Sequence, residues 1–178
     1  HPVAHSFPTR RSSDLMFHDF SHWIDEDRAR HDWVIHTLDQ MDRWRKAGLR
    51  VHPCLLFALI FGEYHECLAQ QFAERGCSPH DAARQAVRQH LQALCENVRV
   101  PKQAIYQVCD IMANQQRFSK TKGRRAQRFL HHKGFLDAFL YFKFAAKTHN
   151  RDLDLLEFWS DLRKNQPPAA PAGKKAKE

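Results

Sequence analysis

A chain of 178 residues is long enough to bury a core of its own. Its net charge of +8 and pI near 9.5 favour a polyanionic partner, either nucleic acid or an anionic membrane surface. The apolar run at 54–61 is too short to cross a bilayer, and no apolar leader follows a basic start, so we expect a cytoplasmic protein without a membrane partner.

The two ends of the chain differ from the rest. Residues 1–15 show no apolar periodicity, and 6–15 resemble a sequencing adapter translated in one frame, so we interpret 1–15 as a non-native leader. The reading frame would then be truncated upstream of Met16. Residues 165–178 are rich in Pro, Ala and Lys, which predicts a disordered tail.

Between these ends, apolar residues recur every three or four positions, and period-two alternation is nowhere sustained. This pattern predicts an all-α fold, an irregular bundle of about six to eight helices. The first clear helix spans about 32–47 and ends at Gly48. The next spans 54–75 behind Pro53, and its first two turns are apolar on every side, so we expect it to be the most buried element.

Further helix starts follow in chain order. Ser78 and Pro79 open a helix that reaches about Leu94, and Pro101 opens one at 102–118. After a polar break at 119–123, helices are expected at about 124–132, 135–147 and 153–164, the last with Asp152 as its N-cap.

The positive charge is concentrated in one part of the sequence. From Arg117 to Arg151 there are ten Lys and Arg residues against one acid, Asp137, so this run carries +9 and the rest about −1. We interpret the basicity as one patch. At its centre, a loop runs into a helix start with further arginines, a pattern suited to holding phosphates bidentately beside the positive end of a helix dipole. The cations concerned are Arg117, Lys120, Lys122, Arg124, Arg125 and Arg128.

Aromatic residues interleave with this charge. They are Phe118, Phe129, Phe135, Phe139, Tyr141 and Phe142. Such rings can stack unpaired bases, but at helical spacing we expect most of them to be core. The arginines could equally form a solvated surface, although a run of 35 residues with one acid favours binding.

A family resemblance can now be stated. It is carried by Pro101, Lys102, Gln115, Gln116, the segment 122–126, Arg128, Leu130, His131, His132, Phe135, Ala138 and Tyr141. This pattern resembles the arginine-rich carboxy-terminal region of bacterial poly(A) polymerases. The segment 50–58 resembles the opening of a neck or body helix, and 157–159 resembles the closing helix. The pattern departs from the family's His-Pro-x-Phe turn, because Lys133 and Gly134 follow His132.

The resemblance implies a helical neck and body at 16–99 and an arginine-rich RNA-binding region at 100–164. It adds Lys102 and Gln116 to the candidate RNA-binding residues. It also implies a parent enzyme that adds adenylate from ATP, with Mg²⁺, to single-stranded RNA 3′ ends with little sequence specificity. Two alternatives remain open: the body of a tRNA CCA-adding nucleotidyltransferase, and a stand-alone helical nucleic-acid-binding protein.

Catalytic residues are not expected in this chain. Two-metal nucleotidyl transfer needs paired carboxylates beside a Gly-rich phosphate loop, whereas the acids at 25–27 follow no such loop and fit a helix start. The histidine pairs 18/22 and 31/36 lack further ligands nearby, and the five cysteines without CxxC spacing fit reduced core thiols. We therefore expect no metal or cofactor site, and a fragment that holds RNA while its catalytic head is absent.

Overall fold

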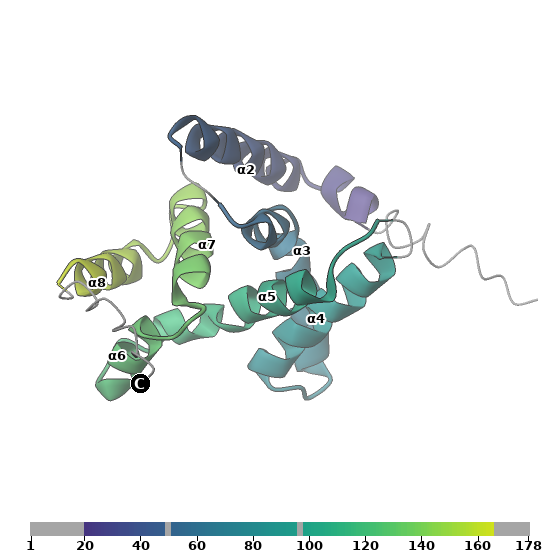
Figure 1. Cartoon of the computed structure of the whole chain (residues 1–178). Helices are drawn as coiled ribbons and strands as arrows, with labels where there is room; N and C mark the ends of the chain where they lie inside the picture. Colours follow the sequence, from purple (N-terminus) through teal and green to yellow (C-terminus); the bar gives the residue numbers. More distant parts are fainter. Residues whose placement is uncertain (1–19, 49–50, 96–97, 166–178) are drawn as a thin grey trace, which may run out of the picture.

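The computed structural model describes residues 20–48, 51–95 and 98–165, and within these ranges the chain is helical and contains no strand (Figure 1). The all-α prediction is confirmed. After a helical segment at residues 20–25, the elements are α2 (Arg28–Lys46), α3 (Pro53–Glu74), α4 (Pro79–Leu94), α5 (Lys102–Ala113), the 3₁₀ helix η1 (Gln115–Ser119), α6 (Arg124–Leu130), α7 (Phe135–Thr148) and α8 (Leu153–Lys164). None of these helices is long and apolar enough to cross a membrane. The leader at 1–15 and the tail at 166–178 lie outside the described ranges.

The helix starts follow local sequence signals. Asp27 caps α2 by accepting from the Ala29 amide at 2.8 Å, so the helix begins four residues before the expected Asp32. At α3, Pro53 follows the cap His52. At α4, the Ser78 hydroxyl accepts from the Asp81 amide at 3.2 Å. Each cap satisfies an amide that has no partner within its helix.

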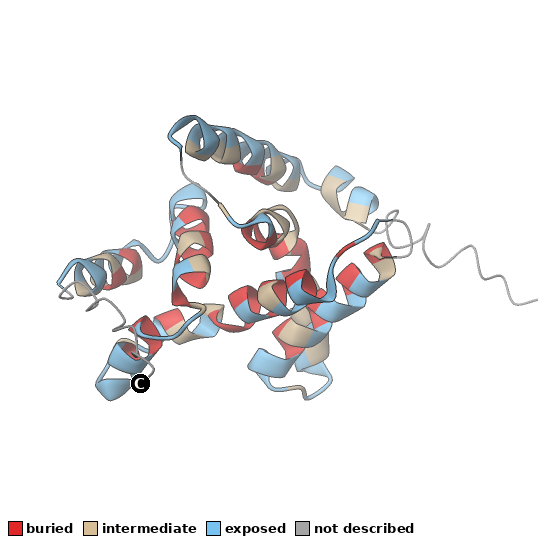
Figure 2. Ribbon diagram, in the orientation of Figure 1, coloured by how far each residue is buried: buried red, intermediate tan, exposed pale blue. Residues whose placement is uncertain are grey.

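The first core cluster joins α3, α4, α5 and one face of α7, with Trp33 of α2 sealing one side. Its most deeply buried side chains include Trp33, Leu55, Leu59, Val87, Leu91, Val108 and Cys109. The Trp33 indole donates to the Leu59 carbonyl at 2.6 Å, which fixes α2 across α3. Figure 2 shows the buried faces of these helices turned towards one another.

The expectation that the helix at Pro53 is the most buried element is wrong. Seven of the 22 residues of α3 are buried, against seven of 12 in α5 and eight of 14 in α7. Leu56, Phe57, Ile60 and Phe61 are only half-buried, because the helices of the described chain cover α3 on part of its circumference. An apolar run indicates how much of its surface a helix can bury, but not how much of that surface other helices cover.

A second cluster, built from aromatic rings, lies under α6 and α8. It contains Phe118, Phe129, Phe135, Phe139, Phe142 and Trp159. Phe118 stacks on Phe142 at 4.5 Å between ring centroids, and the Trp159 indole donates to the Phe118 carbonyl at 2.8 Å. The six rings interleaved with the basic run, Tyr141 included, are all buried, so they are core and leave no platform for bases.

Two element boundaries differ from expectation. The helix expected at 102–118 ends at Ala113 and continues as η1, where the Gln115 side-chain amide donates to the carbonyls of Ile111 and Ala138. Asp152 precedes α8 as expected, but its φ of +57° and lack of a side-chain cap bond rule out the usual N-cap geometry.

Candidate nucleic-acid interface

The helix α6 separates apolar from basic side chains. Ala126, Phe129 and Leu130 are buried against the second cluster, while Arg124, Arg125 and Arg128 are exposed. Residues three and four apart lie on the same helix face, so the three guanidinium groups share one surface. Lys120 and Lys122 are exposed in the turn that leads into it. We call these five residues the α6 surface.

The turn into α6 depends on Gly123. This residue has φ +69° and ψ −159°, a conformation that favours glycine, and no side chain caps the helix behind it. Because α6 has only seven residues, its dipole adds less than that of a long helix. Attraction for phosphate at this surface therefore comes mainly from the cations.

The cations of the α6 surface are not neutralised by neighbouring acids. Within the described ranges, no carboxylate oxygen lies within 4.0 Å of a side-chain nitrogen of these five residues. Because these Lys and Arg side chains are exposed and unpaired, they can bind a phosphate without first breaking an ion pair. Their binding also releases condensed counterions from a nucleic acid.

Arg117 has a different role from its neighbours. Its side chain is half-buried, donates to the Asn114 side-chain oxygen at 3.2 Å, and lies 4.3 Å over the Phe129 ring. These contacts hold η1 against α6. Arg117 borders the α6 surface, and its contact with RNA remains a prediction.

Two of the eight candidate residues lie elsewhere. Lys102 begins α5, and η1 follows the other end of this helix, which is about 18 Å long at 1.5 Å per residue. Gln116 lies on η1 but lines a groove with Glu66 and Gln70 of α3. The structure therefore gathers six of the candidates and separates these two from them.

The prediction that the basic run forms one patch is wrong. Arg151 lies 3.7 Å from Glu66 of α3, whereas Lys143 and Lys147 line hollows towards α2 and α8. Three cations outside the predicted set, Arg43, Arg163 and Lys164, line the same two hollows. Their sequence signal is the cluster of cations in the last turns of α2 and α8, outside the run that was counted.

The turn before α7 closes without the expected proline. The His132 ring accepts from the Gly134 amide at 3.1 Å, and the Phe135 amide donates to the His132 carbonyl at 2.9 Å. Phe135 is thereby placed edge-on against Phe129, 5.2 Å between centroids. The His132 side chain therefore bonds within the turn at which the resemblance leads us to expect a proline.

Comparison with known proteins shows the family of the chain. The family model described as "Polymerase A arginine-rich C-terminus" matches residues 75–177, more than half of the chain. The chain belongs to this family. It is 29% identical over 145 residues to "Poly(A) polymerase I" of Salmonella typhi, covering 80% of this chain and 31% of the relative. It is 32% identical over 123 residues to "Poly(A) polymerase I" of Escherichia coli O157:H7, covering 67% of this chain and 26% of the relative.

This chain spans no more than about a third of the length of these curated relatives. The matches confirm the resemblance to bacterial poly(A) polymerases, and they favour it over the two alternatives left open by the sequence. The match from residue 75 begins upstream of the expected RNA-binding region at 100–164 and includes α4.

Proposed function

We propose that this chain is the RNA-holding portion of a cytoplasmic poly(A) polymerase, whose parent enzyme adds adenylate from ATP, with Mg²⁺, to RNA 3′ ends. The α6 surface carries the proposal, because it gathers five exposed cations that no carboxylate of the described residues neutralises. The chain's own part is to hold the strand, and the chemistry belongs to the rest of the parent protein.

The α6 surface suits binding without sequence preference. Guanidinium and ammonium groups that contact phosphates fix the position of a strand but carry no base information. The rings beneath α6 are buried, so this surface offers no aromatic platform to an unpaired base. An enzyme that extends many different RNA ends requires a grip of this kind.

The test is a titration of a labelled single strand at several salt concentrations. Four to six phosphate contacts predict a log–log salt slope of roughly −3 to −4, so affinity should fall roughly 50- to 300-fold between 50 and 200 mM salt. Arg124→Glu with Arg125→Glu should lower both affinity and slope. A matched control, Arg28→Glu with Arg75→Glu, changes the net charge equally on exposed positions of α2 and the end of α3 and should have the smaller effect.

A flat salt response, or equal behaviour of the two double variants, would reject the α6 surface as the grip. Adding ATP and Mg²⁺ to the bound complex tests the second half of the proposal. We expect no extension of the strand by this chain, and template-free tailing by it would contradict the assignment of chemistry to another part of the parent.

A further inference from the structure

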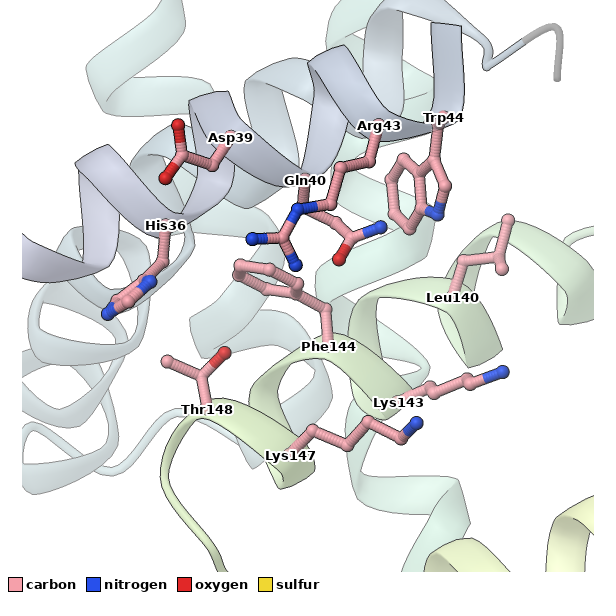
Figure 3. Close-up of a pocket in the computed structure, with 10 residues that line it drawn as sticks. All are labelled: His36, Asp39, Gln40, Arg43, Trp44, Leu140, Lys143, Phe144, Lys147 and Thr148. Atoms are coloured by element: carbon pink, nitrogen blue, oxygen red, sulfur yellow. The ribbon is translucent and has the colours of Figure 1, made fainter. Parts of the chain in front are cut away.

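A hollow of about 370 Å³ lies between α2 and α7, away from the α6 surface. Figure 3 shows side chains of α2 reaching towards α7, with Phe144 and Thr148 pointing back at them. Its lining includes Asp39, Arg43 and Trp44 of α2 and Lys143, Phe144 and Lys147 of α7.

The charge in this hollow is mainly positive. Arg43, Lys143 and Lys147 line it with one carboxylate, Asp39, and no ion pair within 4.0 Å neutralises any of the three cations in the part of the chain described. Figure 3 shows the side chains of Lys143 and Lys147 extending from α7 in the same direction. Concave basic surfaces concentrate the field that an anion experiences.

A second hollow shares the same two lysines. It measures about 520 Å³, lies between α7 and α8, and is lined by Lys143, Lys147, Arg163 and Lys164, with no acidic side chain among the described residues that line it. Lys164 is paired with Asp161 at 3.3 Å, so Arg163 is the freer α8 cation. Lys143 and Lys147, one helical turn apart, thus form a ridge between two basic hollows.

The first hollow also offers an aromatic group. Trp44 is half-buried and lines the hollow beside Leu140, whereas Phe144 is buried and packs edge-on against Trp33 at 4.9 Å. An indole that keeps part of its surface exposed beside unpaired cations can take a base while the cations take phosphates. The α6 surface has no counterpart to this feature.

We propose that these two hollows form a second binding site for single-stranded RNA, in which Lys143 and Lys147 hold phosphates and Trp44 contacts a base. Arg43 and Arg163 extend the site onto α2 and α8. The proposal rests on the RNA-holding function proposed above, but none of its residues belongs to the α6 surface. One strand then contacts two separated surfaces, and its length decides whether it reaches both.

The experiment compares two double variants of the full 178-residue chain against oligoadenylates of about 4 to 24 nucleotides. Lys143→Glu with Lys147→Glu should lower affinity for the longest strand by at least ~10-fold at 50 mM salt and reduce the salt slope by about 1.4, the value for two phosphate contacts. Both lysines are exposed, so circular dichroism should remain that of the wild type. Arg28→Glu with Arg75→Glu again serves as the charge-matched control.

The dependence of affinity on strand length distinguishes a second binding site from nonspecific electrostatic attraction. Wild-type affinity should rise with length until both surfaces are covered, and the Lys143 and Lys147 double variant should reach its plateau at a shorter length. Trp44→Leu should weaken binding of the longer strands while leaving the salt slope unchanged, because it removes a base contact and no charge.

If the lysine variant matches its control, or keeps the wild-type plateau length, the second site is rejected while the α6 surface stands. If instead the chain binds no RNA in any of these titrations, the proposed function itself fails. Loss of affinity in both double variants, with the shortened plateau confined to the lysine variant, supports both proposals separately.

Discussion

His65 and His90 form a buried pair between α3 and α4, with 2.9 Å between Nε2 of His65 and Nδ1 of His90. Burial lowers the pKa of His90 from 6.5 to about 4. Burial, together with the neighbouring His90, lowers the pKa of His65 well below its usual value. Both imidazoles are therefore neutral at pH 7 and pack among Phe61 and Tyr64.

This pair should make the fold sensitive to acid. Because the pKa of His90 in the folded protein lies below its unfolded value, the stabilisation is present above pH 6.5 and is lost as pH falls towards 4. The titration of His90 alone should lower the free energy of unfolding by about 2 kcal/mol between pH 7 and pH 5. Urea denaturation of the wild type and His90→Gln at both pH values checks this. The gap between the two unfolding free energies should narrow at pH 5.

The comparison with His90→Gln is needed because Glu63 acts in the opposite direction. Burial and the nearby Glu66 raise the pKa of Glu63 to about 7, so its contribution to stability increases as pH falls. Both chains contain Glu63, so its effect cancels in the difference. A gap of equal size at both pH values would contradict the assignment to His90.

At the scale of elements, Gly62 of α3 lies directly against the Tyr141 side chain of α7. A Cβ at this position would overlap the ring and hydroxyl of Tyr141, which is 1% exposed. The Tyr141 hydroxyl donates to Glu66 at 2.9 Å, and burial raises its pKa well above 10, so it remains a donor. Glycine is used here for its size, since its backbone is helical.

Gly62→Ala should therefore destabilise the protein, although alanine favours a helix by about 1 kcal/mol over glycine. Overpacking at a buried crossing costs about 1–3 kcal/mol, which exceeds that gain. Thermal unfolding measures the change, and the Tyr141→Leu background provides the control. The loss caused by Gly62→Ala should shrink there, because the space is no longer filled; an undiminished loss would show that Tyr141 is not the obstacle.

The starts of α3 and α4 could be predicted from the sequence because their signals are local. Pro53, Ser78 and Pro79 act within one turn of the helices they open. The end of α5 could not, because it depends on the bonds from Gln115 to Ala138 and from Trp159 to Phe118, whose partners are 23 and 41 residues apart. Such contacts exist only after the helices have packed.

The part of the candidate site that depends on local sequence was predictable, and the part that depends on packing was not. The spacing of Arg124, Arg125 and Arg128 places them on one face of any helix, so their grouping followed from the sequence. The division of the basic run did not, because it depends on which neighbours α7 meets. Arg43 and Lys147 are more than a hundred positions apart, and only the packing of α2 on α7 brings them to one hollow.

At the scale of the whole molecule, α7 belongs to both core clusters. Tyr141, Phe144 and Ala145 join the first cluster, while Phe139 and Phe142, among others, join the second. A helix shared in this way couples the two cores, so we expect the described part of the chain to unfold as one cooperative unit.

Phe142→Ala tests this coupling. Removing a buried phenylalanine should cost about 3–5 kcal/mol, and native-state hydrogen exchange should show protection falling together in α3 and α8. Leu136→Ala, at a position of α7 that is 48% exposed, should leave exchange nearly unchanged. Faster exchange confined to α6 and α8 would show instead that the two clusters open separately.

The burial pattern of α7 also governs which of its positions are free to change. Between residues 138 and 146, Lys143 is the single exposed residue, and the exposed Lys147 lies just beyond. In a randomised library of this helix, selection for folding alone should therefore leave positions 143 and 147 almost unrestricted. If selection for growth or binding then favours Lys or Arg at these two positions, the preference arises from the ligand, because packing of the core does not constrain them.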